Sequence, residues 1–176
     1  MNSLLRRAAP IAAAAAVLAA ASTAWYAQAG PTKPAAETRS IERGRYLARI
    51  AGCNDCHTPG YAMAGGKIDE KAWLTGDKVG WQGPWGTTYP SNLRLVLAKM
   101  TEDEWVRTAK TAQYRPPMPW FALRDMAESD LRALHRYVRH LGPAGEAAPA
   151  FLPPGQAAKG PVIAFPSPPA PKRSAQ

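Results

Sequence analysis

Two cysteines and a histidine stand together in the stretch Cys53-Asn54-Asp55-Cys56-His57, and no other residues in this chain are better placed to do chemistry. Two thiols three positions apart at the end of a helix can each bond to one porphyrin, while the adjacent imidazole reaches the iron. A thioredoxin-like dithiol needs a βαβ pattern that is absent here, and a zinc site needs further ligands. Chance is the remaining alternative. The spacing therefore predicts one haem c, covalently attached through Cys53 and Cys56, with His57 as an iron ligand.

A second iron ligand must come from another part of the chain. The candidates are the remaining thioether and imidazole side chains, which are Met63, Met100, Met118, Met126, His135 and His140. Met118 lies among Pro116, Pro117 and Pro119, which fix the backbone, so its thioether can be held rigidly without a helix around it. Met63 adjoins flexible glycines close to the cysteines, and the other four side chains suit hydrophobic packing or a helix surface. We therefore predict Met118 as the second ligand.

Three helices are expected to position these residues. The first begins near Ser40 and leads the chain into Cys53. The second opens at Thr101, where a Thr-x-x-Glu capping box precedes Trp105. The third is amphipathic, has acidic residues in its first turn and basic residues in its last, and stops before Pro143. It presents its apolar side through Leu131, Leu134, Val138 and Leu141.

Long segments rich in Gly, Pro and Trp separate these helices, and none of them alternates long enough to predict a sheet. The fold class is therefore mostly α, with three or more helices and long loops. Three short helices bury too little apolar surface to stabilise so small a domain. The loops are expected to wrap around a ligand that fills the centre, as one attached haem would. The tryptophans are expected to pack in this core, where an indole N–H can also reach a haem propionate.

The two ends of the chain differ from its middle. Residues 1–29 read as a signal peptide, with two arginines, an apolar stretch and an Ala-x-Ala cleavage site. The alternative is an uncleaved anchor that associates with a membrane through residues 4–24. Residues 30–39 are expected to form a linker and residues 40–143 the folded domain. Residues 144–176 hold eight of the eighteen prolines and should be extended, without ladder hydrogen bonds, either as a loose tail or as a docking arm.

Over residues 41–141 the chain resembles the class I monohaem cytochromes c of bacteria. The likeness rests on residues 43–47 (RGRYL) ahead of the signature, 117–120 (PMPW), and 130–138 (DLRALHRYV). It implies the class I cytochrome c fold around one haem, with Gly44 allowing the first helix to cross the last near Tyr137. It also implies a proline carbonyl that holds His57, for which Pro84 and Pro90 are the candidates. Ala127 departs from the expected Ser or Thr cap of the last helix.

The resemblance implies a periplasmic protein that carries single electrons rather than an enzyme, with His57 and Met118 as axial ligands. It would act as a free carrier or as the cytochrome subunit of a dehydrogenase or respiratory complex. The alternative is a haem enzyme or small-ligand sensor with an open iron position.

The chain has 22 Lys and Arg against 13 Asp and Glu. This excess fits steering toward an acidic face on a redox partner, such as a dehydrogenase, an oxidase or a cytochrome complex. The interspersed charges do not predict nucleic-acid binding.

Overall fold

The computed structural model describes residues 33–166. The chain divides into two units, Met1–Thr38 and Arg39–Gln176, and the second contains all the described elements except the first part of α2. The expected signal peptide and the last ten residues of the extension lie outside the described residues. The elements in chain order are α2 (Lys33–Ile50), α3 (Cys53–His57), the 3-10 helix η1 (Glu70–Ala72), β1 (Gly80–Gly83), β2 (Gly86–Thr88), α4 (Leu93–Ala98), α5 (Glu102–Thr111), α6 (Trp120–Asp125), α7 (Glu128–Leu141) and β3 (Val162–Ala164).

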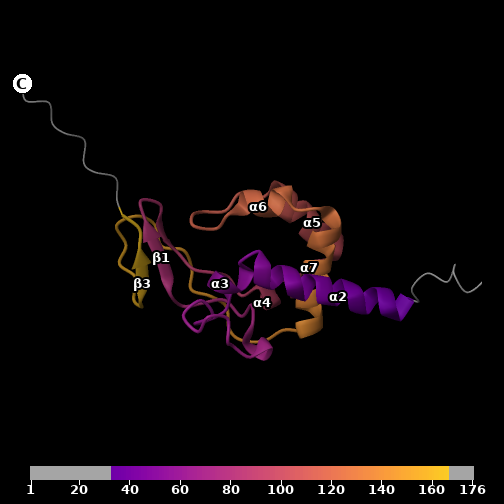
Figure 1. Cartoon of the computed structure of the whole chain (residues 1–176). Helices are drawn as coiled ribbons and strands as arrows, with labels where there is room; N and C mark the ends of the chain where they lie inside the picture. The colour runs from indigo at the N-terminus through magenta and orange to yellow at the C-terminus, as the bar shows by residue number, and fades with distance from the viewer. Residues whose placement is uncertain (1–32, 167–176) are drawn as a thin grey trace, which may run out of the picture. The chain divides into compact units, whose positions relative to one another are not determined.

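The prediction of a mostly helical chain is confirmed (Figure 1). The arrangement is compatible with the class I cytochrome c fold, and the three expected helices correspond to α2, α5 and α7. Helices α3, α4 and α6 were not expected. Across residues 33–166, no helix combines the length and the apolar character needed to cross a membrane.

Helix α2 begins at Lys33, well before Ser40. The prediction that the first helix begins near Ser40 was therefore wrong, because residues 33–39 are already helical. Pro34 falls in the first turn, where a backbone N–H has no partner within the helix and a proline ring is tolerated. A helix can therefore already have begun at the residues around such a proline.

Helices α5 and α7 begin in the two ways that their sequences predict. The hydroxyl of Thr101 accepts a hydrogen bond from the Glu104 N–H (3.2 Å), and the Glu104 carboxylate accepts one from the Thr101 N–H (2.8 Å). This reciprocal pair completes the capping box of α5. Helix α7 follows Ala127, whose side chain provides no cap. Its inward side is buried and carries Leu131, Ala133, Leu134, His135, Tyr137 and Val138.

Helices α2 and α7 cross at Gly44, as the resemblance implied. A Cβ atom at this position would lie 2.6 Å from the Cβ of Tyr137, so only glycine allows the backbones to approach this closely. Tyr137 is fully buried and donates its hydroxyl to the Glu70 carboxylate (2.8 Å). Glu70 also pairs with Arg45 of α2 (2.8 Å). Through Glu70, these contacts connect Arg45 of α2 with Tyr137 of α7 beside the crossing.

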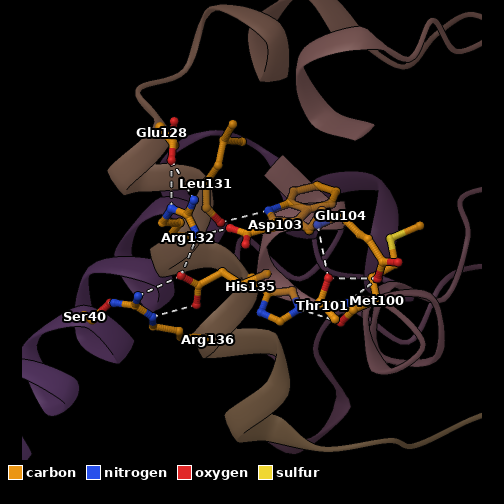
Figure 2. A network of polar contacts seen from close by, with 12 residues as sticks. Ser40, Met100, Thr101, Asp103, Glu104, Glu128, Leu131, Arg132, His135 and Arg136 are labelled. Carbon is orange, nitrogen blue, oxygen red and sulfur yellow. Dashed lines mark hydrogen bonds and ion pairs between the residues drawn. The ribbon is translucent and has the colours of Figure 1, made fainter. Parts of the chain in front are cut away.

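A charged network joins α2, α5 and α7 at the surface (Figure 2). Glu102 accepts hydrogen bonds from Arg132 (3.1 Å) and from Arg136 (2.7 Å). Arg136 also donates to the hydroxyl of Ser40 (3.1 Å), and Arg132 pairs with Asp103 (2.7 Å). Such partly exposed pairs contribute little singly, but a shared carboxylate fixes several side chains at once.

A small sheet lies beside the helices and was not predicted. Its strand order is β2-β1-β3, with β1 and β2 antiparallel and β3 parallel to β1 (Figure 1). Strands of three or four residues are too short for an alternating pattern to be visible in the sequence. The expectation that no sheet forms was therefore wrong.

The proline-rich extension is part of this sheet. The Leu152 N–H donates to the Thr87 carbonyl (3.0 Å) and the Thr87 N–H donates back (2.8 Å). The Gly80 N–H donates to the carbonyl of Pro161 (2.9 Å), just ahead of β3. Prolines lack a donor, but they retain an acceptor, so our expectation that this segment forms no ladder hydrogen bonds was wrong. Residues 144–166 are therefore not a loose tail, because part of this segment pairs with the sheet as a docking arm would.

Candidate cofactor site

Helix α3 carries both cysteines and the histidine of the signature. Helix α2 ends at Ile50, and Gly52 then adopts a left-handed conformation (φ 73°) that turns the chain directly into α3. This conformation is strained for any residue with a side chain, which explains the glycine before Cys53. Both Cys53 and Cys56 are free thiols, partly buried. The sharp turn therefore starts the second helix at the first cysteine.

Burial keeps the two thiols protonated in the protein alone. Removal from water raises the pKa of Cys53 to about 11 and raises the pKa of Cys56 as well. The thiols are consequently not activated as nucleophiles, which argues against a dithiol redox site of the thioredoxin kind. Among residues 33–166 no group of three or more His, Cys, Asp or Glu side chains is placed to hold a metal ion. A zinc site at Cys53 and Cys56 therefore lacks further ligands in this part of the chain.

His57 is buried and oriented by one hydrogen bond. Its Nδ1 lies 2.7 Å from the carbonyl oxygen of Ser91, and a carbonyl can only accept, so Nδ1 carries the proton. Burial lowers the pKa of His57, which favours the neutral imidazole. Nε2 then keeps a free lone pair for a metal ion. The expected proline carbonyl is replaced by that of Ser91, because the Pro90 carbonyl accepts from the Asp77 N–H instead.

The neighbours of His57 are also held in place. The Gly76 N–H donates to the His57 carbonyl (2.8 Å). The Thr58 hydroxyl donates to the Asn54 side chain (2.8 Å) and accepts from the Leu74 N–H (2.8 Å). Asn54 and Thr58 are almost completely buried. The signature is thus anchored through the side chain of Asn54 and the backbone of His57.

Cys53, Cys56 and His57 all line one cavity of about 540 Å³. This volume lies in the range of sites for cofactors and drug-sized ligands. The remaining walls are mainly apolar and come from β1, α4, α5, α7, the loops between these elements and the C-terminal extension. They include Leu74, Trp81, Tyr89, Leu93, Leu97, Trp105, Leu134, Val138 and Phe151. The cavity is the hollow centre that, from the sequence, a ligand is expected to fill.

Met118 lines the same cavity, in the loop that leads into α6. Its N–H donates to the Arg115 carbonyl (3.3 Å), and its carbonyl accepts from the Trp120 N–H (2.9 Å). The Thr88 hydroxyl of β2 donates to the Pro116 carbonyl (2.8 Å). Backbone and sheet contacts, rather than a helix, therefore hold the thioether at the cavity wall.

The other ligand candidates separate into two groups. Met100 and Met126 also line the cavity. Met63 is 94% exposed and lies outside the cavity wall. His135 is buried, contrary to our expectation of a surface role, and its Nε2 lies 3.0 Å from the Met100 carbonyl. His140 is exposed at the end of α7.

The tryptophans divide between core and cavity. Trp73 and Trp105 are buried, and their indole N–H groups donate to the carbonyls of Ile68 (2.9 Å) and Leu131 (2.8 Å). They are therefore core residues in the sense expected, although Trp105 also reaches the cavity. Trp81 lines the cavity as well, whereas Trp85 packs against Phe165.

Several residues of this site were not predicted from the sequence. Ser91 supplies a backbone carbonyl, which no side-chain pattern reveals. Asn92 precedes the apolar run of α4 as its N-cap, and this signal was present in the sequence. Phe151 lines the cavity from the extension, and Arg115 stacks on its ring (3.9 Å to the centroid).

The residues present fit a haem. The walls are apolar, two thiols stand three positions apart, a neutral imidazole has its Nδ1 already engaged, and a thioether lines the same space. The donor set of imidazole and thioether suits an iron porphyrin rather than a hard cation. The cavity volume and the lining are thus consistent with the prediction from the signature.

The chain is similar to cytochrome c subunits of bacterial dehydrogenases. It is 29% identical over 121 residues to the fructose dehydrogenase cytochrome subunit of Gluconobacter japonicus, a match that covers 61% of this chain and 22% of the relative. It is 28% identical over 120 residues to the cytochrome c subunit of the alcohol dehydrogenase (quinone) of Gluconacetobacter polyoxogenes, covering 61% and 23%. One of the subunits of the nicotinate dehydrogenase of Pseudomonas putida is 24% identical over 140 residues, covering 72% and 11%.

The region matched is a small part of each relative. The chain spans less than a quarter of the length of each of these relatives. No protein-family model and no solved structure matches the chain.

Proposed function

We propose that this protein is a class I c-type cytochrome that carries single electrons as a subunit or partner of a dehydrogenase. One haem c would be attached through Cys53 and Cys56, with His57 and Met118 as axial ligands. One observation carries the proposal: the two thiols, the oriented imidazole and the thioether all line a single apolar cavity. The similarity to cytochrome c subunits supports it independently.

The haem supplies a one-electron couple between ferric and ferrous iron. The chain's residues set the conditions for that couple. His57 is held by its Nδ1 hydrogen bond, which fixes the ring and increases the basicity of Nε2. The thioether of Met118 is a weak donor, and such a ligand raises the reduction potential. The apolar walls exclude water, which disfavours the more highly charged ferric state.

The relatives direct the proposal of partners and location. Because they are cytochrome subunits of dehydrogenases, we propose that the electron donor is a dehydrogenase and that this chain is not itself the catalytic subunit. The N-terminal export signal indicates the periplasm as the compartment, with residues 4–24 as a membrane anchor if the signal is not cleaved. The formal charge is +9 for the whole chain and +7 without Arg6 and Arg7 of the export signal, and either excess favours an acidic face on the partner.

The proposal is tested by purifying the exported protein from cells that attach haem to such signatures. We expect coloured protein whose mass exceeds that of the polypeptide by one haem, and whose colour persists after denaturation. The Cys53→Ala, Cys56→Ala double variant should lose the haem when unfolded. Colourless wild-type protein with the mass of the bare polypeptide would contradict the proposal.

A further inference from the structure

The residue after Ser91 is an almost completely buried asparagine with three hydrogen bonds. Asn92 is 2% exposed. Its side-chain oxygen accepts from the Leu95 N–H (3.1 Å) and so caps α4. Its Nδ2 donates to two carbonyls of the C-terminal extension, those of Ala144 (2.8 Å) and Glu146 (3.0 Å). Capping α4 requires only the side-chain oxygen, so the two hydrogen bonds donated by Nδ2 are not needed for the cap.

Asn92 and the acceptor of His57 belong to one peptide unit. The carbonyl that accepts from His57 Nδ1 is bonded to the backbone nitrogen of Asn92. Because a peptide unit is planar and rigid, a rotation of Asn92 would turn the Ser91 carbonyl away from the imidazole. Both polar atoms of the Asn92 side chain are held in place, Oδ1 by the first turn of α4 and Nδ2 by the extension. The direction of the carbonyl is therefore fixed as well.

The extension is itself a stable anchor. Leu152 pairs with Thr87, and β3 pairs with β1, so the segment after Glu146 is tied to the sheet. Gly145 lies between the two accepting residues with φ 72°, and a Cβ there would stand 3.2 Å from Nδ2 of Asn92. A glycine at this point lets both carbonyls reach the same amide group.

We propose that Asn92 is a positioning residue for His57: the extension, through the Ala144 and Glu146 carbonyls, holds Asn92 so that the Ser91 carbonyl stays against Nδ1. This inference rests on the proposed role of His57 as an iron ligand. It assigns residues 144–146 to the proximal side of the haem site. A weaker bond at Nδ1 lowers the basicity of the imidazole and frees the ring to rotate.

The test compares Asn92→Ser with Glu146→Ala in the haem-loaded protein. Serine is a good N-cap, so Asn92→Ser retains the start of α4, but its hydroxyl is too short to reach both carbonyls. Glu146→Ala removes the exposed ion pair with Lys78 and keeps the Glu146 carbonyl, so it is the matched control. We measure the midpoint potential and the proton NMR signals of the His57 ring.

We expect Asn92→Ser to shift the potential upward and to broaden or double the His57 signals, while Glu146→Ala matches the wild type. If Asn92→Ser lowers the free energy of unfolding but leaves the potential and the signals unchanged, Asn92 is only structural and the inference is wrong. Gly145→Ala is a second variant, whose methyl group would press on Nδ2 of Asn92 while the capping oxygen is retained, and it should raise the potential and disturb the His57 signals as Asn92→Ser does. Unchanged readouts in Gly145→Ala also overturn the inference. A wild type without haem contradicts the proposed function instead.

Discussion

The guanidinium of Arg94 donates to the carbonyl of Gly142, the C-cap residue that follows α7. It donates also to the carbonyls of Leu141 and Lys71, the latter at 2.7 Å. Arg94 is buried, and these acceptors are backbone carbonyls rather than carboxylates. One side chain thus joins α4, the end of α7 and η1.

Replacement of this side chain should destabilise the protein. Arg94→Leu leaves three partly buried carbonyls without their donor, and we expect a loss of about 2 kcal/mol in the free energy of unfolding. The measurement is denaturant unfolding of the haem-loaded protein. Arg139→Leu is the control, because exposed Arg139 donates to a single carbonyl, that of Ala98 (2.6 Å). If both variants lose the same free energy of unfolding, the burial of Arg94 does not explain the loss in Arg94→Leu.

The crossing of α2 and α7 gives a second prediction. In Gly44→Ala the new methyl group would meet the Ala133 carbonyl oxygen at 2.1 Å, a backbone atom that cannot move aside cheaply. We expect a loss of about 2–3 kcal/mol in the free energy of unfolding. Gly160→Ala adds the same methyl group where the nearest atom is 3.8 Å away, and it should be almost neutral. A Gly44→Ala protein as stable as the wild type would contradict the close crossing.

A third prediction concerns the second iron ligand. In the haem-loaded protein, Met118→Ala should lower the midpoint potential by on the order of 100 mV or more, since a thioether ligand raises it. The ferric spectrum should lose its weak methionine-to-iron band near the red end. Met63→Ala is the control, because this side chain is exposed.

Met100 and Met126 also line the cavity, so they are the alternatives. An unchanged spectrum and potential in Met118→Ala would assign the ligand to one of them. If the wild-type reduced protein already binds carbon monoxide readily, the iron has an open position and the sensor or enzyme alternative is favoured.

The charged network gives a pH prediction. Burial raises the pKa of Glu102, but hydrogen bonds and charges from Arg136 and Arg132 outweigh it, so the pKa lies below its ordinary value of 4.5. A carboxyl whose pKa is lowered by folding stabilises the protein fully above its unfolded-state pKa, and that stabilisation is lost as the pH falls through the folded-state value.

Glu102→Gln should therefore cost about 1 kcal/mol near neutral pH, since both arginine partners are partly exposed. The difference from the wild type should shrink as the pH falls below 4.5. Unfolding curves of both proteins across this range test it, with Glu42→Gln as a control at an exposed carboxyl on α2. A difference that persists at low pH would have a cause other than ionisation of Glu102.

The features predicted correctly from the sequence are local ones. The capping box at Thr101 and Glu104 depends on residues three apart, and the apolar stripe of α7 repeats within four. Such patterns are complete within one or two turns of helix. The crossing at Gly44 involves distant segments, and it was anticipated through the resemblance to a known family.

The features that were not predicted depend on the path of the chain. Whether Ser91 or Pro90 accepts from His57 is decided by how the loop turns, and Asp77 takes the other carbonyl. Helix α4 follows a good cap at Asn92, but its run of apolar residues is too short to show a helical period. Likewise β3 forms only because β1 is already present to receive it.

The pairing of β1 with β3 has a consequence for assembly. Trp81 and Ile163 are register partners, although helices α4 to α7 lie between them in the chain. Contacts between such distant segments form late, after the local helices. Because Phe151, in the segment that leads to β3, contributes to the cavity wall, we expect that wall to close last. A bulky cofactor would then enter before the C-terminal segment has paired with the sheet. Once paired, that segment would hold the cofactor in the cavity.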